Sequence, residues 1–441
     1  MNNLFDSFSP ANLTQWENQL VKDLKGQSED LLQRQDAIEE VDYATFQHVD
    51  SPSATPSSIW GDKYARGLQK ESNSFFNVKN IRVTDAKTAN EEAITALNSG
   101  ANALRFVMEA DVELSVLLQN IQLDVIQTRF ANPSIQLVQE LAQSHTDLLG
   151  SHLLIEWDAL QIDTYFDAIQ STLTQKQFPV FVANGYAVQQ IGANTSQEVG
   201  FILTAAHDAL CYLMEKGMTV DQAAACIHFQ VGVGQKYFFE IAKTRVLRML
   251  WSKIIEGYAP TSECTKNAII LGMTGFINKS IQDPHTNLLR QTTEVASLIL
   301  GGADAIVCQP HDSYSTAGGT VLASRMALNI PNILVEESYF DKVIDPYAGS
   351  YAVEFLSNTI ADKAWELFNS YNASNGFTNE ANVEGFKSLL VEKQNLRKAL
   401  FAEGKAKFIG INSFPNPEQV EGTWLSTGSY LGLEFLVYER A

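Results

Sequence analysis

The chain has 441 residues, with 31 Lys and Arg against 51 Asp and Glu, which gives a formal net charge of −20. This surplus of negative charge disfavours non-specific attraction to nucleic acid or to anionic membranes. A hydrophobic content of 45% with 19% charged residues is typical of a folded protein with a large core. We find no signal-peptide pattern at the start and no apolar run near the roughly 20 residues of a membrane span. A cytoplasmic protein without nucleic-acid or membrane partners is expected.

The cysteine content predicts no special chemistry. The chain has four cysteines, which are widely spaced and form no Cys-x-x-Cys pair: Cys211, Cys226, Cys264 and Cys308. This spacing indicates neither a disulfide framework nor a zinc site, so we expect buried free thiols and no metal site.

Residues 1–70 are expected to form an extension ahead of the main domain. Ser9-Pro10 is typical of a helix start, and an apolar stripe at helical spacing follows before Gly26: Leu13, Trp16, Leu20, Val21 and Leu24. The resulting amphipathic helix could pack on the main domain or on a partner chain, and the sequence does not choose between them. Residues 51–58 hold two prolines among hydroxyl residues, which predicts an extended linker.

From Phe75 onward, short apolar runs alternate with helical patterns. The expected strands are residues 76–83, 103–108, 121–128, 152–157, 178–183, 227–231, 268–272 and 305–308. Helices are expected between them, at 89–98, 111–119, 133–143, 163–174, 196–215, 237–255 and 283–300, with further helices after residue 319 and at 349–370 and 383–404. Eight strand-then-helix units predict an α/β fold of the (β/α)8 TIM-barrel type, and the count disfavours an open doubly wound sheet.

Three motifs in the last third of the chain resemble one known family. They are Ser324-Arg325-Met326-Ala327-Leu328-Asn329, Glu336-Glu337-Ser338 and the turn from Asp345 to Tyr351. Methylmalonyl-CoA mutases carry aligned Ser-Arg-x-Ala-x-Asn, Glu-Glu-Ser and Asp-Pro-x-x-Gly-Ser-Tyr runs, and residues 406–414 resemble the segment that closes their barrel domain. The resemblance implies an acyl-CoA mutase-type barrel over residues 71–414. The tail at 415–441 is too short for another domain.

The loop after the fifth strand carries the sharpest difference from this family. Residues 184–193 resemble the signature Gly-Tyr-His-Met-Gln-Glu-x-Gly-Ala, but Ala187 stands where the family has its catalytic histidine. A methyl group neither donates a hydrogen bond nor titrates, so no catalytic residue is predicted. Tyr186 and Gln189 of this loop, with His311 after the last strand, are the predicted substrate-binding residues.

Other features of catalytic chains are missing or altered. Residues 121–157 hold no counterpart of the family's Gly-Thr-Ile-Gln-Asn-Asp run, and in the shortened stretch 60–67 we interpret Tyr64 as a packing residue. Gly318-Gly319 could admit an anion at the following helix. The cobalt-ligating pattern Asp-x-His-x-x-Gly is matched only by Asp283-Pro284-His285, with Leu288 in place of glycine, so Asp283 is interpreted as a helix cap. No cobalamin-binding domain and no cofactor bound by this chain are expected.

Within the family, the chain is most similar to the small subunit of the heterodimeric enzyme. That resemblance implies a non-catalytic subunit of a cobalamin-dependent isomerase, which interconverts methylmalonyl-CoA and succinyl-CoA in propionate metabolism. Adenosylcobalamin and the active site would belong to a large partner subunit, and the isolated chain could form a homodimer. Two alternatives stay open: an active barrel that uses a separate cobalamin-binding protein, and a non-enzymatic acyl-CoA-binding or chaperone-like barrel.

Overall fold

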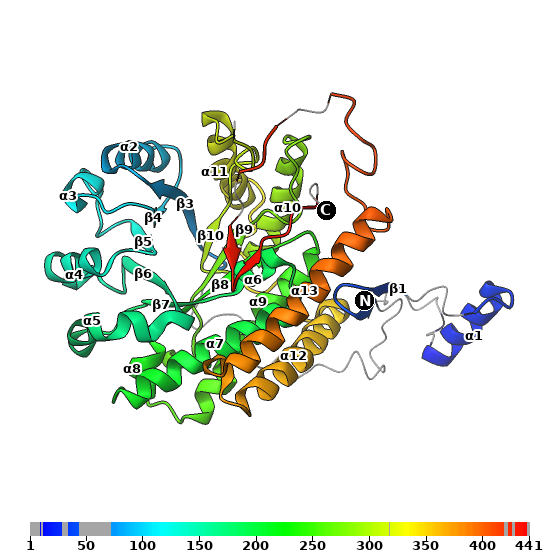
Figure 1. Cartoon of the computed structure of the whole chain (residues 1–441). Helices are drawn as coiled ribbons and strands as arrows, with labels where there is room; N and C mark the ends of the chain where they lie inside the picture. The colour runs from blue at the N-terminus through cyan, green and yellow to red at the C-terminus, as the bar shows by residue number, and fades with distance from the viewer. Residues whose placement is uncertain are drawn as a thin grey trace, which may run out of the picture.

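The computed structural model describes residues 9, 12–28, 34–43, 72–316, 318–418, 422–425 and 428–438. Its centre is a closed barrel of parallel strands in the order β10-β3-β4-β5-β6-β7-β8-β9 (Figure 1). The strands are β3 (Phe76–Val83), β4 (Ala103–Met108), β5 (Gln127–Ala131), β6 (Leu153–Asp158), β7 (Phe181–Asn184), β8 (Ile227–Val233), β9 (Ile270–Thr274) and β10 (Ala305–Val307). The predicted (β/α)8 barrel is confirmed.

Helices surround the barrel and join successive strands. They are α2 (Ala86–Leu97), α3 (Leu114–Leu117), α4 (Ile135–Ser144), α5 (Ile162–Gln175), α6 (Gly185–Ile191), α7 (Thr195–Glu215), α8 (Val220–Ala224), α9 (Tyr237–Gly257), α10 (Thr286–Leu300) and α11 (Val321–Glu336). Short 3-10 helices lie at η4 (Thr146–Leu148), η5 (Ala159–Gln161) and η6 (Glu263–Lys266). The main core lies between strands and helices, where outward-facing aromatic side chains such as Phe106, Phe130 and Trp157 are buried.

Two of the strand pairings that close the barrel are short. Strand β10 pairs with β3 through Ala305 opposite Phe76 and Ile306 opposite Asn77. On the other side, β6 meets β7 through Trp157 opposite Phe181 and Asp158 opposite Val182. Longer registers hold β3 to β6 together, and likewise β7 to β10. The barrel therefore consists of two four-stranded halves with brief contacts between them.

The third predicted strand was placed too early in the chain. Residues 121–126 form an irregular segment with a turn at 123–125 after Asn120, whose φ of 62° is left-handed, and β5 begins at Gln127. Ile121 and Leu123 are nevertheless buried in the main core. The apolar run therefore covers the core from a connecting segment, which periodicity alone does not distinguish from a strand.

Several helix starts also differ from the prediction. Helix α4 begins after Ser134, whose side chain caps Leu137 N, while the carbonyl of Pro133 accepts a hydrogen bond from Trp157 Nε1 at 2.8 Å. Helix α1 (Leu13–Leu24) is capped by Asn12 and not by Ser9. The capping side chain decides the start in both cases, because it satisfies backbone N–H groups that the first turn leaves free.

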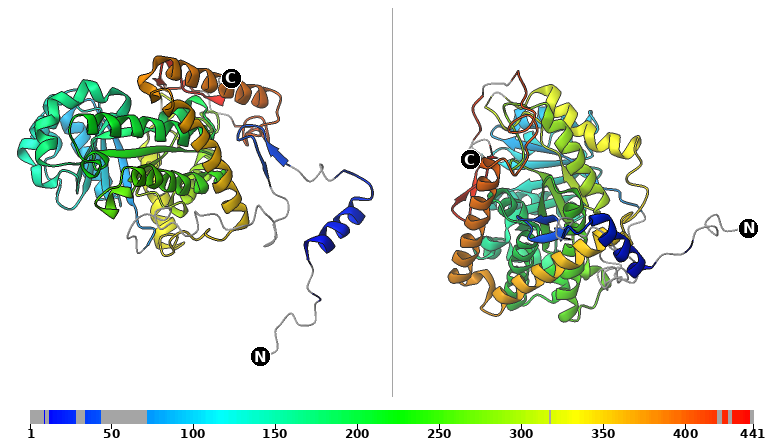
Figure 2. Two further views of the ribbon diagram at one scale, coloured as in Figure 1. Left: turned by 90° about the horizontal axis from the view of Figure 1, so that it is seen from below. Right: turned by 90° about the vertical axis from the view of Figure 1, so that its right-hand side faces the viewer.

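Further elements flank the barrel (Figures 1 and 2). Helices α12 (Tyr351–Asn372) and α13 (Glu380–Ala402), joined through η7 (Gly376–Thr378), lie along one side, where α12 packs on α7 and α9. An antiparallel hairpin of β1 (Arg34–Asp36) and β2 (Val41–Tyr43) precedes the barrel, and β11 (Ser429–Tyr430) pairs with β12 (Leu433–Glu434) after it. Helix α1 stands apart from the barrel in these views.

Some sequence predictions concern residues outside the described ranges. The linker at 51–58 and the stretch 60–67 with Tyr64 both fall there. Among the helices that the structure does describe, none is both long enough and apolar enough to cross a membrane.

Candidate functional site

The mouth of the barrel is shaped by helix α6, in the segment that the sequence predicted to be a loop. Asn184 begins the helix by accepting a hydrogen bond from Ala187 N at 3.1 Å. Gly185 lies so close to β8 that a Cβ atom would be 2.3 Å from Ile202 Cδ1 and 2.8 Å from the Gln230 carbonyl oxygen. This close approach seats α6 on the barrel, with Ala187 only 3% exposed.

Tyr186 points from α6 into the barrel. Its ring packs on apolar side chains that line one half of the interior: Val78, Ala103, Leu271, Met273, Ala305 and Val307. Burial raises the pKa of the Tyr186 hydroxyl well above its ordinary value, against the opposing effect of the Arg105 charge. Tyr186 is therefore a protonated, largely packed side chain close to the axis of the barrel.

The other half of the interior holds an ionic cluster. Glu156 on β6 accepts from Arg105 Nε at 2.7 Å and from Gln230 Nε2 at 2.8 Å, and its second oxygen is 3.5 Å from Arg129 Nη1. Arg105 also donates to Asn80 Oδ1 at 2.9 Å. Burial acts to raise the pKa of Glu156, but the two arginines together hold it below its usual value. The carboxylate thus stays ionised and links β6 to β4, β5 and β8 across the interior.

His228 completes this cluster from β8. Its Nε2 is 3.0 Å from the carbonyl oxygen of Ile155, so Nε2 carries the hydrogen and donates. Burial, more than any neighbouring charge, lowers the pKa of His228 to about 4. The imidazole is therefore neutral at pH 7 and fills space beside the Arg105–Glu156 pair.

Gln189 and Gln190 tie α6 to two other segments. Gln190 Nε2 donates to Gln189 Oε1, and Gln190 Oε1 accepts from Phe276 N at 2.5 Å. The backbone oxygen of Gln190 accepts from Leu436 N, near the end of the chain, at 2.7 Å. A Cβ at Gly275 would lie 2.0 Å from Gln190 Nε2, so a larger residue there would displace the Gln190 side chain from these contacts. Gln189 is thus engaged by the side chain that follows it in α6.

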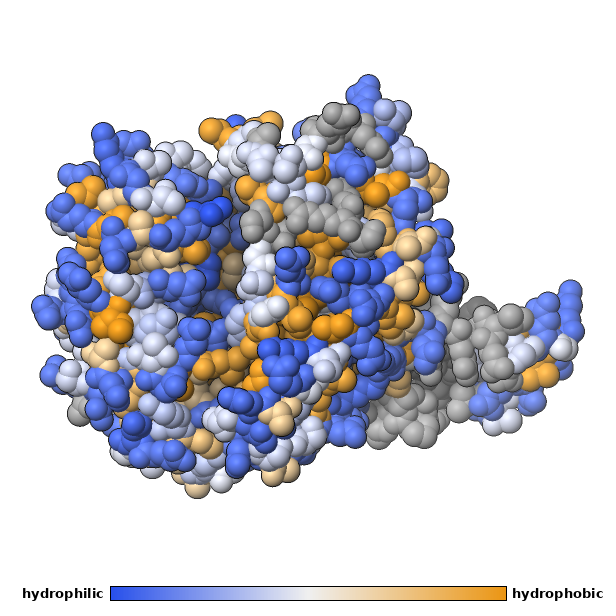
Figure 3. Space-filling model, viewed as in Figure 1, coloured by the Kyte–Doolittle hydropathy of each residue, from blue (hydrophilic) through white to orange (hydrophobic). Residues whose placement is uncertain are grey.

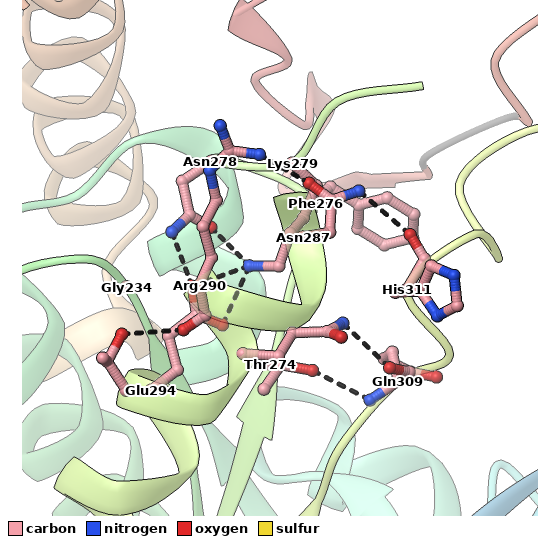
Figure 4. A network of polar contacts seen from close by, with 12 residues as sticks. Gly234, Thr274, Phe276, Asn278, Lys279, Asn287, Arg290, Glu294, Gln309 and His311 are labelled. Carbon is pink, nitrogen blue, oxygen red and sulfur yellow. Dashed lines mark hydrogen bonds and ion pairs between the residues drawn. The ribbon is translucent and has the colours of Figure 1, made fainter. Parts of the chain in front are cut away.

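His311 lies in the loop after β10, beside the start of α10 (Figure 4). Its carbonyl oxygen accepts from Asn287 Nδ2 at 2.9 Å, and its ring is 5.5 Å from that of His285. Burial lowers the pKa of His311. The three predicted substrate-binding residues have different neighbours: Tyr186 packs on the apolar half of the barrel interior, Gln189 contacts Gln190, and His311 lies beside the start of α10.

A second buried ion pair lies at this end of the barrel and was not predicted. Lys279, in the loop after β9, places Nζ at 2.7 and 2.8 Å from the two carboxylate oxygens of Glu294 on α10 and at 2.6 Å from Asn278 Oδ1 (Figure 4). Burial lowers the pKa of Lys279, and the Glu294 charge opposes this. A lysine in a loop sequence normally indicates a surface position, so no sequence signal marked this contact.

The β1–β2 hairpin closes part of the mouth. Lys236 Nζ contacts Asp36 Oδ1 at 2.5 Å and Glu39 Oε1 at 3.3 Å, while Glu39 Oε2 accepts from Thr195 N at the start of α7 at 2.8 Å. The cavity beneath has a volume of about 30 Å³ and is bordered by Glu39, Gln189, Glu198 and Glu240. Since one water needs about 10–15 Å³ by this measure, the cavity accommodates water and not an acyl chain.

Lys243 lies below this cavity between two carboxylates. Its Nζ is 2.8 Å from Glu198 Oε2 and 2.5 Å from Glu240 Oε2, and all three side chains are buried. Burial raises the pKa of Glu198 to about 7, against the opposing effect of Lys243 and with a further rise from Glu240. The triad joins α7 to α9 directly behind the hairpin.

An open cleft lies on the other side of the mouth, between β3 and the loop before α11 (Figure 3). Its volume is about 370 Å³, and its walls include Lys79, Asn80, Arg82, Phe276 and Tyr314. Lys79 Nζ is already engaged by Ser324 Oγ at 2.6 Å and Glu92 Oε1 at 2.8 Å.

The N-terminus of α11 borders this cleft but is already capped. Asp312 accepts hydrogen bonds from Gly319 N at 2.9 Å and from Thr320 N at 3.2 Å. The anion that the Gly318-Gly319 pair was expected to admit is thus supplied by the chain itself, as an aspartate carboxylate.

The residues that match part of the cobalt-ligating pattern do not fit that role. Helix α10 begins at Thr286, so Asp283 is not its N-cap, contrary to the prediction. Asp283 is buried, accepts from Thr286 Oγ1 and lies 3.4 Å from Asn416 Nδ2. These contacts hold the carboxylate in a turn, and His285 faces His311 instead.

The four cysteines are free thiols, as expected, but they are not all buried. Cys226 and Cys308 are buried, Cys211 is half-buried and Cys264 is exposed. Cys264 lies in η6, on a connecting segment, which explains why the general tendency of cysteine to be buried does not hold there.

The fold is that of a closed (β/α)8 barrel protein, and comparison with known proteins gives the family. Residues 161–427 match the family model of methylmalonyl-CoA mutase. The chain belongs to the methylmalonyl-CoA mutase family.

Individual relatives sharpen this assignment. The chain is 30% identical over 453 residues to the methylmalonyl-CoA mutase small subunit of Porphyromonas gingivalis, covering 95% of this chain and 72% of that one. It is 28% identical over 282 residues to a probable small subunit of Mycobacterium bovis, covering 59% and 45%. Against the methylmalonyl-CoA mutase of Rhizobium meliloti it is 32% identical over 244 residues, which are 55% of this chain and 34% of that one.

Proposed function

We propose that this chain is the small, non-catalytic subunit of a cobalamin-dependent methylmalonyl-CoA mutase and that it supports a large catalytic subunit in the cytoplasm. The similarity to proteins named as small subunits supports the place within the family. Adenosylcobalamin in the large subunit would supply the radical chemistry of the rearrangement.

The observation that carries the proposal is the combination of Ala187 with a filled barrel. Ala187 offers neither a proton nor a hydrogen-bond donor at the position of the signature histidine. Tyr186 packs against the apolar side of the interior, and Arg105, Arg129 and Glu156 occupy the other side. A substrate arm would have to displace these paired charges from a buried position, at a cost of several kcal/mol.

The role of such a chain is to offer a rigid scaffold to its partner. The ion pair of Lys236 with Glu39 fixes the β1–β2 hairpin to the loop after β8, and the pair of Lys279 with Glu294 fixes the loop after β9 to α10. Buried pairs of this kind favour a single conformation over several, which suits a subunit whose surface must match another chain.

The test is reconstitution with the large methylmalonyl-CoA mutase chain of the same organism. We expect the two chains to co-purify at micromolar concentration and the complex to be active with adenosylcobalamin, while this chain alone with the cofactor is inactive. Ala187→Ser in the complex should leave the turnover number unchanged, because no step uses this residue. A chain that stays alone beside the large subunit, or that is active with an isolated cobalamin-binding protein, would disprove the proposal.

A non-catalytic acyl-CoA-binding role is the second candidate, because the open cleft of about 370 Å³ is within the ligand-pocket range of about 300–1,000 Å³. Arg82, whose ion pair with Glu109 is exposed, is the group in the cleft wall that would bind a phosphate or carboxylate. Calorimetry with methylmalonyl-CoA and coenzyme A, on the wild type and on Arg82→Ala, distinguishes the two roles. Saturable binding that Arg82→Ala weakens supports the second candidate, and absence of heat argues against it.

A further inference from the structure

Three side chains with metal-binding chemistry meet on the outer side of the barrel, far from the mouth residues described above. His207 and Cys211 are one turn apart on α7, and Tyr258 follows the last turn of α9. The Tyr258 hydroxyl is 2.7 Å from His207 Nε2 and 3.4 Å from Cys211 Sγ, and Cys211 Sγ is 3.7 Å from His207 Nε2. One nitrogen, one sulfur and one oxygen donor thus form a small triangle.

The size of this triangle is close to one face of a tetrahedral zinc site. With Zn–N of about 2.0–2.1 Å, Zn–S of about 2.3 Å and Zn–O of about 2.0–2.2 Å, two donors on one ion are about 3.3–3.6 Å apart. The Sγ–Nε2 and Sγ–hydroxyl distances of 3.7 and 3.4 Å already lie near these values. The Nε2–hydroxyl distance of 2.7 Å is that of a hydrogen bond, so metal binding requires the Tyr258 hydroxyl to move away from Nε2.

The surroundings favour a cation. Cys211 is half-buried, so an ion can reach it from solvent. Burial is the main cause that raises the pKa of the Cys211 thiol, and the negative charges of Asp208 and Glu215 raise it further. Those carboxylates would attract a metal ion to the same place. The edge-on contact of Phe368 with the His207 ring, at 5.4 Å between centroids, limits the directions that the imidazole can take.

We propose that His207, Cys211 and Tyr258 form a binding site for a divalent ion of the zinc type, with water at the fourth position. Binding replaces the thiol proton, which passes to solvent, and links α7 to the end of α9. Within the described residues, no three His, Cys, Asp or Glu side chains gather around one such point, and here a tyrosine oxygen supplies the third donor. The site is independent of the mutase role.

Cobalt(II) provides the direct test, because a thiolate ligand gives a near-ultraviolet charge-transfer band and a tetrahedral site gives intense visible bands. The full chain is reduced, stripped with a chelator and titrated with Co²⁺. We expect both bands to saturate at one ion per chain and to disappear when Zn²⁺ is added. Absence of the charge-transfer band in the wild type would overturn the proposal.

Substitutions assign the ligands. Cys211→Ser should abolish the charge-transfer band, and His207→Ala should weaken binding at least tenfold, while Cys264→Ser, which removes the exposed thiol, should change neither. Tyr258→Phe should weaken Co²⁺ binding several-fold. Unchanged binding in this variant would show that Tyr258 is not the third ligand. A band that survives in Cys211→Ser would place the ion at another thiol and disprove the site. Circular dichroism of each variant separates a lost ligand from a lost fold.

Discussion

Arg105 on β4 and Glu156 on β6 meet inside the barrel, with Nε 2.7 Å from Oε2, although strand β5 lies between their strands. Arg129 on the intervening strand shares the same carboxylate. One acidic group therefore compensates two buried guanidinium groups. This unequal ratio makes Glu156 the residue on which the interior of the barrel depends.

Replacing that carboxylate should destabilise the fold strongly. In Glu156→Gln, both arginines lose their buried counter-charge, and we expect the free energy of unfolding to fall by about 3–5 kcal/mol in urea denaturation. The matched control is Glu109→Gln, which breaks the exposed Arg82–Glu109 pair and should cost about 0–1 kcal/mol. Equal losses in the two variants would show that the interior pair is not buried as described.

His228 predicts a pH dependence of stability. Its pKa is about 4 in the fold, against an ordinary value of 6.5, so between these values the unfolded chain binds more protons than the folded one. The neutral imidazole of His228 makes its full contribution to the free energy of unfolding above pH 6.5. This contribution, on the order of 3 kcal/mol, is lost as the pH falls toward 4. His228→Gln should flatten the stability curve in this range. The control His145→Gln changes a histidine outside the barrel interior and should leave the pH dependence of the free energy of unfolding as it is in the wild type. If His228→Gln also leaves it unchanged, His228 is not its source.

Lys236 should control the attachment of the hairpin. Lys236→Ala removes the cation between Asp36 and Glu39, so amides of residues 34–43 should exchange with deuterium at least several-fold faster, while the barrel strands stay protected. Lys253→Ala, which removes an exposed pair with Glu256, serves as the control and should leave hairpin exchange unchanged. Unaltered exchange at 34–43 in Lys236→Ala would mean that other contacts hold the hairpin.

Gly185 should tolerate no larger side chain. Gly185→Ala brings a methyl group within 2.3 Å of Ile202 and 2.8 Å of a backbone oxygen, which predicts a loss of about 1–3 kcal/mol from overpacking. Gly257→Ala is the matched control, since nothing lies within 4 Å of its added Cβ, and it should be neutral or slightly stabilising. Thermal unfolding of both variants decides the point, and a neutral Gly185→Ala would contradict the tight seating of α6.

The barrel could be predicted from the sequence because the patterns that indicate it lie within short stretches of the chain. Short apolar runs such as residues 305–308 alternate with helical periodicity, and this pattern is enough for the (β/α)8 architecture. The run at 121–126 led to a wrong strand start, because Ile121 and Leu123 are buried from an irregular connecting segment. A burial pattern shows that a segment faces the core but not always in which conformation.

The contacts of the site could not be predicted from the sequence in the same way, because the contacting residues are far apart in the chain. Glu39 meets Thr195 N across 156 positions and Glu156 meets Arg105 across 51, so no local pattern marks either contact. His207 and Cys211 have a helical spacing that is visible in the sequence, but Tyr258 joins them only through the packing of α7 against α9. Ala187 could be singled out in advance only because a motif surrounds it.

The attachment of the chain's last segment to α6 also affects how the gene can vary. Leu436 N donates to the Gln190 carbonyl oxygen at 2.7 Å, and Gln394 Nε2 donates to the carbonyl oxygens of Ile191 and Glu434, each at 3.1 Å. A premature stop codon that removed residues from 433 onward would remove the bonds made by Leu436 N and by the Glu434 carbonyl oxygen, and would leave the Gln394–Ile191 bond on α6 as the remaining one of the three. Variants that lose this segment should therefore hold α6 less firmly, by the contribution of one or two hydrogen bonds, about 0.5–1.5 kcal/mol each.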